Sequence, residues 1–145
     1  MALRFIETDI EIDASAGKVW SIISDFSTWV DWHPYVDRAR GSLEAGRKVV
    51  LLKGAPGGRT IAVKQRVASV EDAAEFRLAG SLGFRGLLDN EHRFRVEPVD
   101  ENRCRFLHGQ AFRGVLVRLM IRRRGESTYE IFDEINGALK AYVEG

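Results

Sequence analysis

The chain has 145 residues, of which 45% are hydrophobic and 30% charged, and its formal net charge is +1. This composition is typical of one soluble globular domain, expected to span residues 1–145, rather than of a disordered or fibrous protein. A net charge so close to zero argues against nucleic acid or an anionic membrane as a partner.

Two further features of the composition indicate a cytoplasmic protein. Cys104, the single cysteine, cannot form an internal disulfide, which fits a reducing compartment. The first 15 residues lack the apolar segment of a signal peptide, and no apolar run approaches the roughly 18–20 residues that span a bilayer. We therefore expect no stable insertion into a membrane.

The first predicted strand covers residues 4–13, where apolar and acidic side chains alternate. Because successive strand residues point to opposite faces, one face should be buried. Ser15 then offers a hydroxyl N-cap for a helix that begins with "AGKVW". Pro34 disfavours helical geometry at His33, so any helix in the aromatic-rich segment 25–35 should end there.

Six strand-like runs follow, separated by glycine- and proline-containing breaks and by charged turns. They lie at residues 36–42, 47–54, 59–70, 74–81, 87–97 and 103–113. From Val115 to Val143 the apolar spacing becomes helical, with Gly125 as a kink or an interruption. The expected apolar stripe of this helix comprises Leu116, Leu119, Met120, Ile131, Ile135, Ala138, Leu139 and Tyr142. This order predicts an antiparallel meander with the terminal helix packed on one face.

The order of elements, with "DFSTWVDWHPYV" at residues 25–36, resembles the START-like superfamily, also called SRPBCC or Bet v 1-like. "DNEHRFRVEP", "RCRFLHGQAFRGVL" and "INGALKAYVE" are similar to a bacterial polyketide cyclase/dehydratase-like subgroup, with Asn90 replacing a glycine and Gln110 a glutamate. The resemblance implies an α+β helix-grip fold, in which a curved antiparallel sheet wraps around a long C-terminal helix with an apolar cavity between them. The superfamily includes ligand carriers, cyclases and chaperone activators, so the fold does not determine the function.

Two predicted strands carry a histidine on the face where apolar residues are expected. His92 shares a face with Phe94, and His108 shares a face with Phe106 and Phe112, while the opposite faces are rich in charge. Pairing Val96 with Cys104 places His92 opposite His108 and Asn90 opposite Gln110. A shift of two residues places His92 opposite Gln110 instead, and a shift of one is excluded because it would expose an apolar face.

Either pairing predicts a polar patch of His92, His108, Asn90 and Gln110 on an apolar inner surface. Unpaired buried polar groups cost about 1–3 kcal/mol each, so the patch either satisfies its own hydrogen bonds or faces a ligand or ordered water. Candidate ligand-binding residues are Trp32, Phe84, Leu88, Asn90, His92, Phe94, His108, Gln110, Phe112 and Met120. For Trp32, Phe84 and Met120, ordinary roles in loop packing, a surface turn and the core remain open.

The favoured function is binding of a small apolar or aromatic molecule that the polar patch orients. The first alternative is a polyketide cyclase/dehydratase-like enzyme with His92 and His108 as acid–base groups, although Gln110 cannot exchange a proton as a glutamate would. The second is a chaperone-activator-like interaction module, which needs an exposed apolar patch. The histidine spacing does not match a zinc motif, and we expect neither a metal nor a cofactor. A homodimer is compatible with the sequence.

Overall fold

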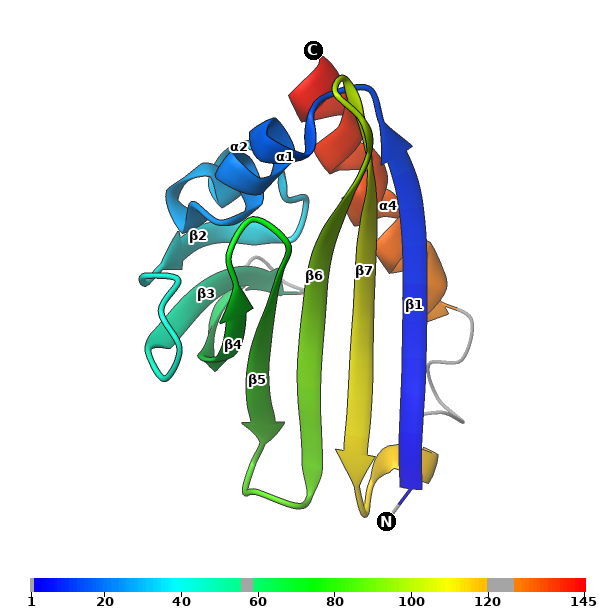
Figure 1. The fold of residues 1–145 in the computed structure, drawn as a ribbon. Coiled ribbons are helices and arrows are strands. Elements are labelled where there is room, and N and C mark those ends of the chain that lie inside the picture. Colours follow the sequence, from blue (N-terminus) through cyan, green and yellow to red (C-terminus); the bar gives the residue numbers. More distant parts are fainter. Residues whose placement is uncertain (1, 56–58, 120–126) are drawn as a thin grey trace.

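A seven-stranded antiparallel sheet forms the frame of the protein in the computed structural model, which describes residues 2–55, 59–119 and 127–145. The strands are β1 (Ala2–Ile12), β2 (Val36–Arg40), β3 (Lys48–Ala55), β4 (Arg59–Glu71), β5 (Glu75–Leu82), β6 (Leu88–Asp100) and β7 (Arg103–Gly114). Their order in the sheet is β1-β7-β6-β5-β4-β3-β2. All strands but β1 therefore follow one another as a meander, and β1 closes the far edge against β7 (Figure 1).

Helices cover the inner face of this curved sheet. The long helix α4 (Ser127–Glu144) lies behind β6, β7 and β1, and α1 (Ala16–Ile23) with α2 (Trp29–Trp32) lies at the upper end (Figure 1). A 3-10 turn, η1 (Phe26–Thr28), joins α1 to α2. The expected α+β helix-grip fold is confirmed. No helix among the described residues is long and apolar enough to cross a membrane.

Local sequence signals explain where the N-terminal helices begin and end. The Ser15 hydroxyl accepts a hydrogen bond from the backbone N–H of Lys18 at 3.2 Å, which is the predicted N-cap of α1. Val19 and Ile23 are fully buried on the inner side of that helix. His33, which precedes Pro34, has extended backbone geometry with φ −80° and ψ 116°, and α2 ends directly before it.

The C-terminal helix differs from the prediction in extent and in orientation. Residues 117–119 are helical and α4 begins at Ser127, whereas Met120 and Gly125 lie outside the described residues. Three predicted stripe residues are exposed, Leu119 at 47%, Ile131 at 39% and Tyr142 at 41%, and the buried positions of α4 are Phe132, Ile135, Asn136, Leu139 and Val143. Leu119 and Ile131 still line the cavity, so the predicted stripe was wrong at Tyr142, and α4 turns Phe132 and Asn136 towards the sheet.

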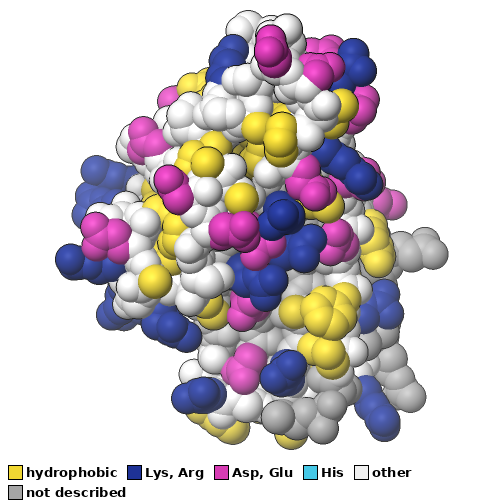
Figure 2. Space-filling model, viewed as in Figure 1, with side chains coloured by type: hydrophobic (Ala, Val, Ile, Leu, Met, Phe, Trp, Pro, Cys, Tyr) yellow, Lys and Arg dark blue, Asp and Glu magenta, His cyan; other side chains and the backbone are white. Residues whose placement is uncertain are grey.

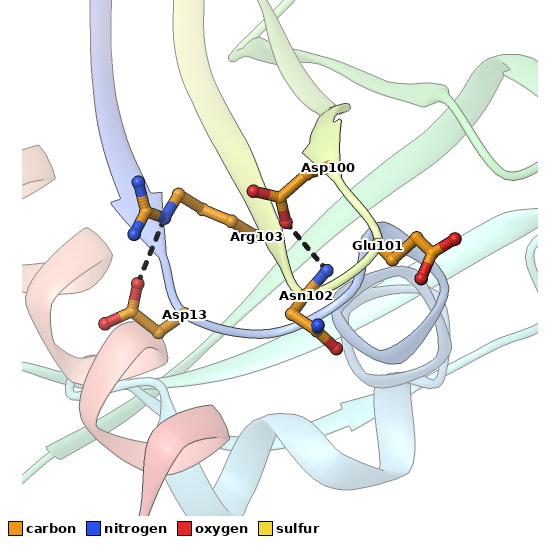
Figure 3. Close-up of a pocket in the computed structure, with 5 residues that line it drawn as sticks. All are labelled: Asp13, Asp100, Glu101, Asn102 and Arg103. Carbon is orange, nitrogen blue, oxygen red and sulfur yellow. Dashed lines mark hydrogen bonds and ion pairs between the residues drawn. The ribbon is translucent and has the colours of Figure 1, made fainter.

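The turn between β6 and β7 determines the register of the two histidine-bearing strands. Asp100 and Arg103 are paired, so only Glu101 and Asn102 form the turn, and the ladder has an irregularity between Pro98 and Asp100. The Asp100 carboxylate accepts a hydrogen bond from the Asn102 backbone N–H at 2.8 Å (Figure 3). This tight turn pairs Pro98 with Cys104, so the predicted pairing of Val96 with Cys104 was wrong by two residues.

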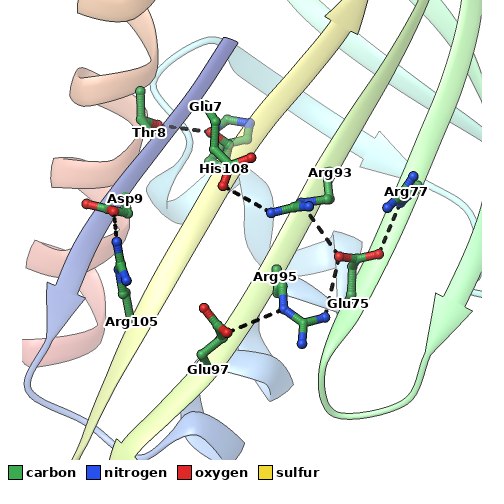
Figure 4. A network of polar contacts seen from close by, with 10 residues as sticks. All are labelled: Glu7, Thr8, Asp9, Glu75, Arg77, Arg93, Arg95, Glu97, Arg105 and His108. Carbon is green, nitrogen blue, oxygen red and sulfur yellow. Dashed lines mark hydrogen bonds and ion pairs between the residues drawn. The ribbon is translucent and has the colours of Figure 1, made fainter. Parts of the chain in front are cut away.

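Charged side chains cover the outer face of the sheet. Arg93 lies 3.1 Å from Glu7 and 3.6 Å from Glu75, and thus connects β6 with β1 and β5 (Figure 4). Arg93 passes over β7 at Gly109, which is paired with both Glu7 and Arg93 and has no side chain to obstruct the contact. No histidine is visible on the described part of this face (Figure 2). The charges therefore mark the solvent side of the sheet, and the histidines point to the other side.

The chain turns back under the sheet at Gly114, directly after β7. Gly114 has φ +130°, and a Cβ atom there would lie 2.6 Å from the carbonyl oxygen of Leu87. This close approach lets the backbone N–H of Leu116 donate to the same carbonyl at 3.1 Å. A side chain at residue 114 would displace the segment that brings Leu116 under the sheet.

We expect Gly114→Ala to lower the free energy of unfolding by at least about 2 kcal/mol, since it combines an unfavourable φ with a steric clash. Urea unfolding followed by circular dichroism measures the loss. Gly17→Ala is the matched control, because a Cβ at Gly17 in α1 has no heavy atom within 4 Å. The control should keep or gain stability, and equal stability of the two variants would contradict the role assigned to Gly114.

Candidate functional site

A cavity of about 600 Å³ lies between the inner face of the sheet, the segment around α2, and α4. Its described apolar wall consists of Trp29, Leu51, Gly54, Leu78, Leu88, Phe94, Phe112, Leu116, Leu119, Ile131, Phe132 and Ile135. Its polar wall consists of His33, Tyr35, Lys53, Gln65, Asn90, His92, His108, Gln110 and Thr128. The cavity thus combines an apolar surface with a set of polar side chains that could orient a small molecule.

Seven of the ten candidate residues line this cavity: Leu88, Asn90, His92, Phe94, His108, Gln110 and Phe112. Trp32 does not, because its ring is buried in the core, where Nε1 lies 3.3 Å from the Thr28 hydroxyl. Trp29 takes the wall position instead. Phe84 is 68% exposed in the β5–β6 connection and is not among the lining residues. Met120 lies outside the described residues.

The imidazole of His108 is stacked against two phenylalanine rings. Phe94, its partner across the β6–β7 ladder, stacks on it at a centroid distance of 4.8 Å. Phe132 of α4 stacks on it at 4.4 Å with an interplanar angle of 12°. His108 is 1% exposed. These contacts fix the plane of the ring.

A chain of hydrogen bonds fixes the tautomer of His108. The side-chain amide of Asn136 donates to the Thr8 hydroxyl at 2.8 Å, and that hydroxyl donates to the backbone carbonyl of His108 at 3.0 Å (the Thr8 contact is drawn in Figure 4). The amide oxygen of Asn136 therefore faces the imidazole, with Nδ1 of His108 3.2 Å away. Because an amide oxygen only accepts, Nδ1 carries the proton and donates it, so Nε2 of the neutral ring is an acceptor.

That Nε2 atom is buried and has no hydrogen-bond partner within the described part of the chain. Burial lowers the pKa of His108 to about 4, although the hydrogen bond to Asn136 opposes the shift. The ring is consequently neutral at neutral pH. An unpartnered buried acceptor is costly, and a ligand hydroxyl or an ordered water would relieve that cost.

The second predicted histidine lies beside His108 rather than opposite it. His92 pairs with Gln110, which is the alternative register of the sequence prediction, and its ring centroid is 6.0 Å from that of His108. Burial is also the main reason that the pKa of His92 lies well below its usual value. Among the hydrogen bonds of the described residues, none joins His92 to His108, Asn90 or Gln110. The hydrogen bonds of the described residues therefore do not show the predicted patch satisfying its own polar groups.

Sequence reasoning missed several polar residues of the site. His33 stacks on Trp29 at 5.4 Å, and burial lowers its pKa to about 3. Gln65 is 7% exposed on β4, and its side-chain oxygen has no partner among the described residues. It lies against Gly80, where a Cβ would come within 2.6 Å of the amide nitrogen. The available signal was strand alternation, which places Gln65 on the same face as buried Val67.

Tyr35 joins the segment after α2 to the C-terminal helix. Its hydroxyl donates a short hydrogen bond to the carboxylate of Glu134 in α4, and this bond raises the pKa of Tyr35. The contact connects two elements that contribute to the cavity wall. Within the described ranges, no three His, Cys, Asp or Glu side chains converge as metal ligands.

The comparisons with known proteins agree with this architecture. The family described as "Polyketide cyclase / dehydrase and lipid transport" matches residues 5–144. No curated protein matches the sequence.

Several solved structures share the fold. The di-domain ARO/CYC BexL from the BE-7585A biosynthetic pathway has a TM-score of 0.78 and 20% identity over 97% of this chain, which spans only 46% of that protein. The Zhui aromatase/cyclase from a Streptomyces species has a TM-score of 0.77 and 17% identity, covering 99% of this chain and 94% of the other. A START superfamily protein from Mycobacterium smegmatis has a TM-score of 0.68 and 18% identity, covering 95% and 98%. At such identities the likeness shows the fold alone.

The lowered pKa of His108 predicts a loss of stability in mild acid. The folded protein binds this proton only near pH 4, whereas the unfolded chain binds it near the ordinary value of 6.5. Between pH 4 and pH 6.5 the unfolded state therefore binds more protons than the folded state. The free energy of unfolding should fall as the pH drops from 6.5 towards 4, by up to about 1.4 kcal/mol per pH unit for this residue.

Urea unfolding at neutral pH and at two values between 6.5 and 4 measures this fall. His108→Phe keeps an aromatic ring against Phe94 and Phe132 but removes the titrating group, so its stability should depend less on pH over the same interval. A variant with the pH dependence of the wild type would contradict the assignment, whatever its stability at neutral pH.

Proposed function

The chain belongs to the polyketide cyclase/dehydrase and lipid transport family, and we propose that it binds a small apolar or aromatic molecule bearing a hydroxyl group in the cavity beside α4. The unpartnered Nε2 of His108 carries this proposal. It is an acceptor in a fixed orientation, so its complement on a ligand is a hydrogen-bond donor such as a phenol, enol or alcohol. The buried amide of Gln65 offers a second polar contact in the same cavity.

The apolar wall supplies the driving force for such binding. Phe94, Phe112, Phe132 and Trp29 give it a strongly aromatic character. Each Å² of apolar surface removed from water contributes about 25 cal/mol, so a ligand of two or three fused rings gains several kcal/mol before the losses of association. The polar residues then select the orientation of the ligand, because a wrongly placed ring leaves their hydrogen-bonding groups unsatisfied.

The electrostatics of the cavity support binding more strongly than acid–base catalysis. His92 and His108 both have lowered pKa values, so neither is an imidazolium that could act as a general acid at neutral pH. His108 is hydrogen-bonded to the neutral amide of Asn136, which does not stabilise an imidazolium as a carboxylate would. A cyclase or dehydratase mechanism that alternates protonation at these histidines has little support from this arrangement.

An uncharged fluorescent probe, N-phenyl-1-naphthylamine, tests whether the cavity binds apolar molecules. We expect saturable enhancement of its fluorescence at one site per chain. Gln110→Trp places a bulky ring in the cavity and should weaken binding by about tenfold or more, roughly 1.4 kcal/mol. Ala111→Trp is the matched control, since the next residue of β7 points to the outer face and should leave binding unchanged.

Non-saturable binding, or equal effects of Gln110→Trp and Ala111→Trp, would contradict the proposal. Far-ultraviolet circular dichroism of both variants verifies that each retains the fold before their affinities are compared.

The hydrogen bond to His108 is tested by the displacement of that probe with 2-naphthol and with its methyl ether, which lacks the donor. Wild-type protein should prefer 2-naphthol by about three- to tenfold, the value of one hydrogen bond. His108→Phe should remove the preference while still binding the methyl ether, which serves as an internal control for an intact cavity. If His108→Phe still prefers 2-naphthol over its methyl ether, the ligand hydroxyl donates its hydrogen bond to another residue.

A further inference from the structure

Lys53 is a cationic side chain in the described wall of the cavity. It lies on β3 two residues after Leu51 and four after Val49, so strand alternation places all three on the inner face. Val49 is fully buried and Leu51 is 6% exposed, whereas Lys53 is half-buried and lines the cavity. Its neighbour across β2 and β3, Val36, is also buried.

No carboxylate balances this charge among the described residues. The described lining residues include no aspartate or glutamate, and the ion pairs among described residues do not involve Lys53. The cations of the outer face are different: Arg77, Arg93 and Arg95 all lie within 3.6 Å of the Glu75 carboxylate. Among the described residues, these arginines are paired on the solvent side of the sheet, whereas Lys53 on the cavity side has no carboxylate partner.

The other titratable groups that face the cavity do not supply an anion either. His33, His92 and His108 are neutral at neutral pH, and the charge of Lys53 contributes to the lowering of each pKa. The Tyr35 hydroxyl is bonded to Glu134, and its pKa is raised, so it does not ionise readily. Burial in turn lowers the pKa of Lys53, which means that the ammonium form is not fully stabilised by its present surroundings.

An unpaired charge next to apolar surface is unfavourable, and a ligand anion is the simplest group that compensates for it. We propose that Lys53 binds the carboxylate of the molecule in the cavity, so that the ligand is an apolar or aromatic acid rather than a neutral hydrocarbon. This inference rests on the proposed function, because it assigns the class of molecule that the same cavity takes. His108 and Lys53 then give the ligand two polar anchors, a hydroxyl and a carboxylate, on one apolar body.

Two competitors of nearly identical shape test the proposal: 2-naphthoate, which is anionic at neutral pH, and the neutral 2-naphthamide. Each is titrated against the N-phenyl-1-naphthylamine complex in the wild type and in Lys53→Met, Lys53→Arg and Lys64→Met. Lys53→Met keeps the length of the side chain without its charge, and Lys53→Arg keeps the charge. Lys64 is exposed on the outer face of β4 and serves as the matched control.

We expect the wild type to prefer 2-naphthoate, and Lys53→Met to weaken its binding by about tenfold or more. In Lys53→Met the affinity for 2-naphthamide should change by less than about twofold. Lys53→Arg and Lys64→Met should both retain the preference for the acid. If Lys53→Met still binds the uncharged probe but weakens both competitors equally, or weakens neither, the role of Lys53 is overturned. Failure of the probe to bind the wild type overturns the proposed function, and this inference with it.

Discussion

The hydrogen bond between His108 and Asn136 connects the two walls of the cavity, the sheet and the helix α4. It joins the sheet to the C-terminal helix at a buried position, and it orients the imidazole that contributes to the cavity wall. Phe94 of the sheet and Phe132 of the helix both stack on the same ring, so the helix, the sheet and the histidine are positioned together. The geometry of the cavity therefore depends on how α4 packs against β1 and β7.

The two faces of the sheet handle charge in opposite ways. On the outer face, Glu75 contacts three arginines, and solvent screens whatever imbalance remains (Figure 4). On the inner face, burial keeps the histidines neutral and leaves Lys53 as the charged group among the described lining residues. The described wall of the cavity therefore carries a positive charge at Lys53, and an anionic ligand would supply the complementary negative charge.

Alternation within strands predicted most of the architecture, because inward and outward side chains differ so clearly in β1, β6 and β7. The register of β6 and β7 was predicted only to within two residues, since it depends on a two-residue turn that the sequence does not distinguish from a longer one. Asn136 and Lys53 were missed for different reasons. The contact of Asn136 requires the rotation of α4 against the sheet, a tertiary property, and a single lysine in a strand is usually exposed. Trp29 and Trp32 are both buried, and the sequence could not show which of them lines the cavity, because the geometry of a short helix determines this.

The position of β1 has a consequence for how the protein reaches its native state. This strand pairs with β7 over eleven residue pairs, and Thr8 bonds to His108, one hundred positions away. Contacts between such distant segments form slowly, because the entropy of closing a long loop is lost before the contacts compensate for it. The meander from β2 to β7 can assemble from local hairpins, whereas the edge that anchors Asn136 through Thr8 requires both ends of the chain. Closure of the cavity thus depends on this long-range pairing between the two ends of the chain.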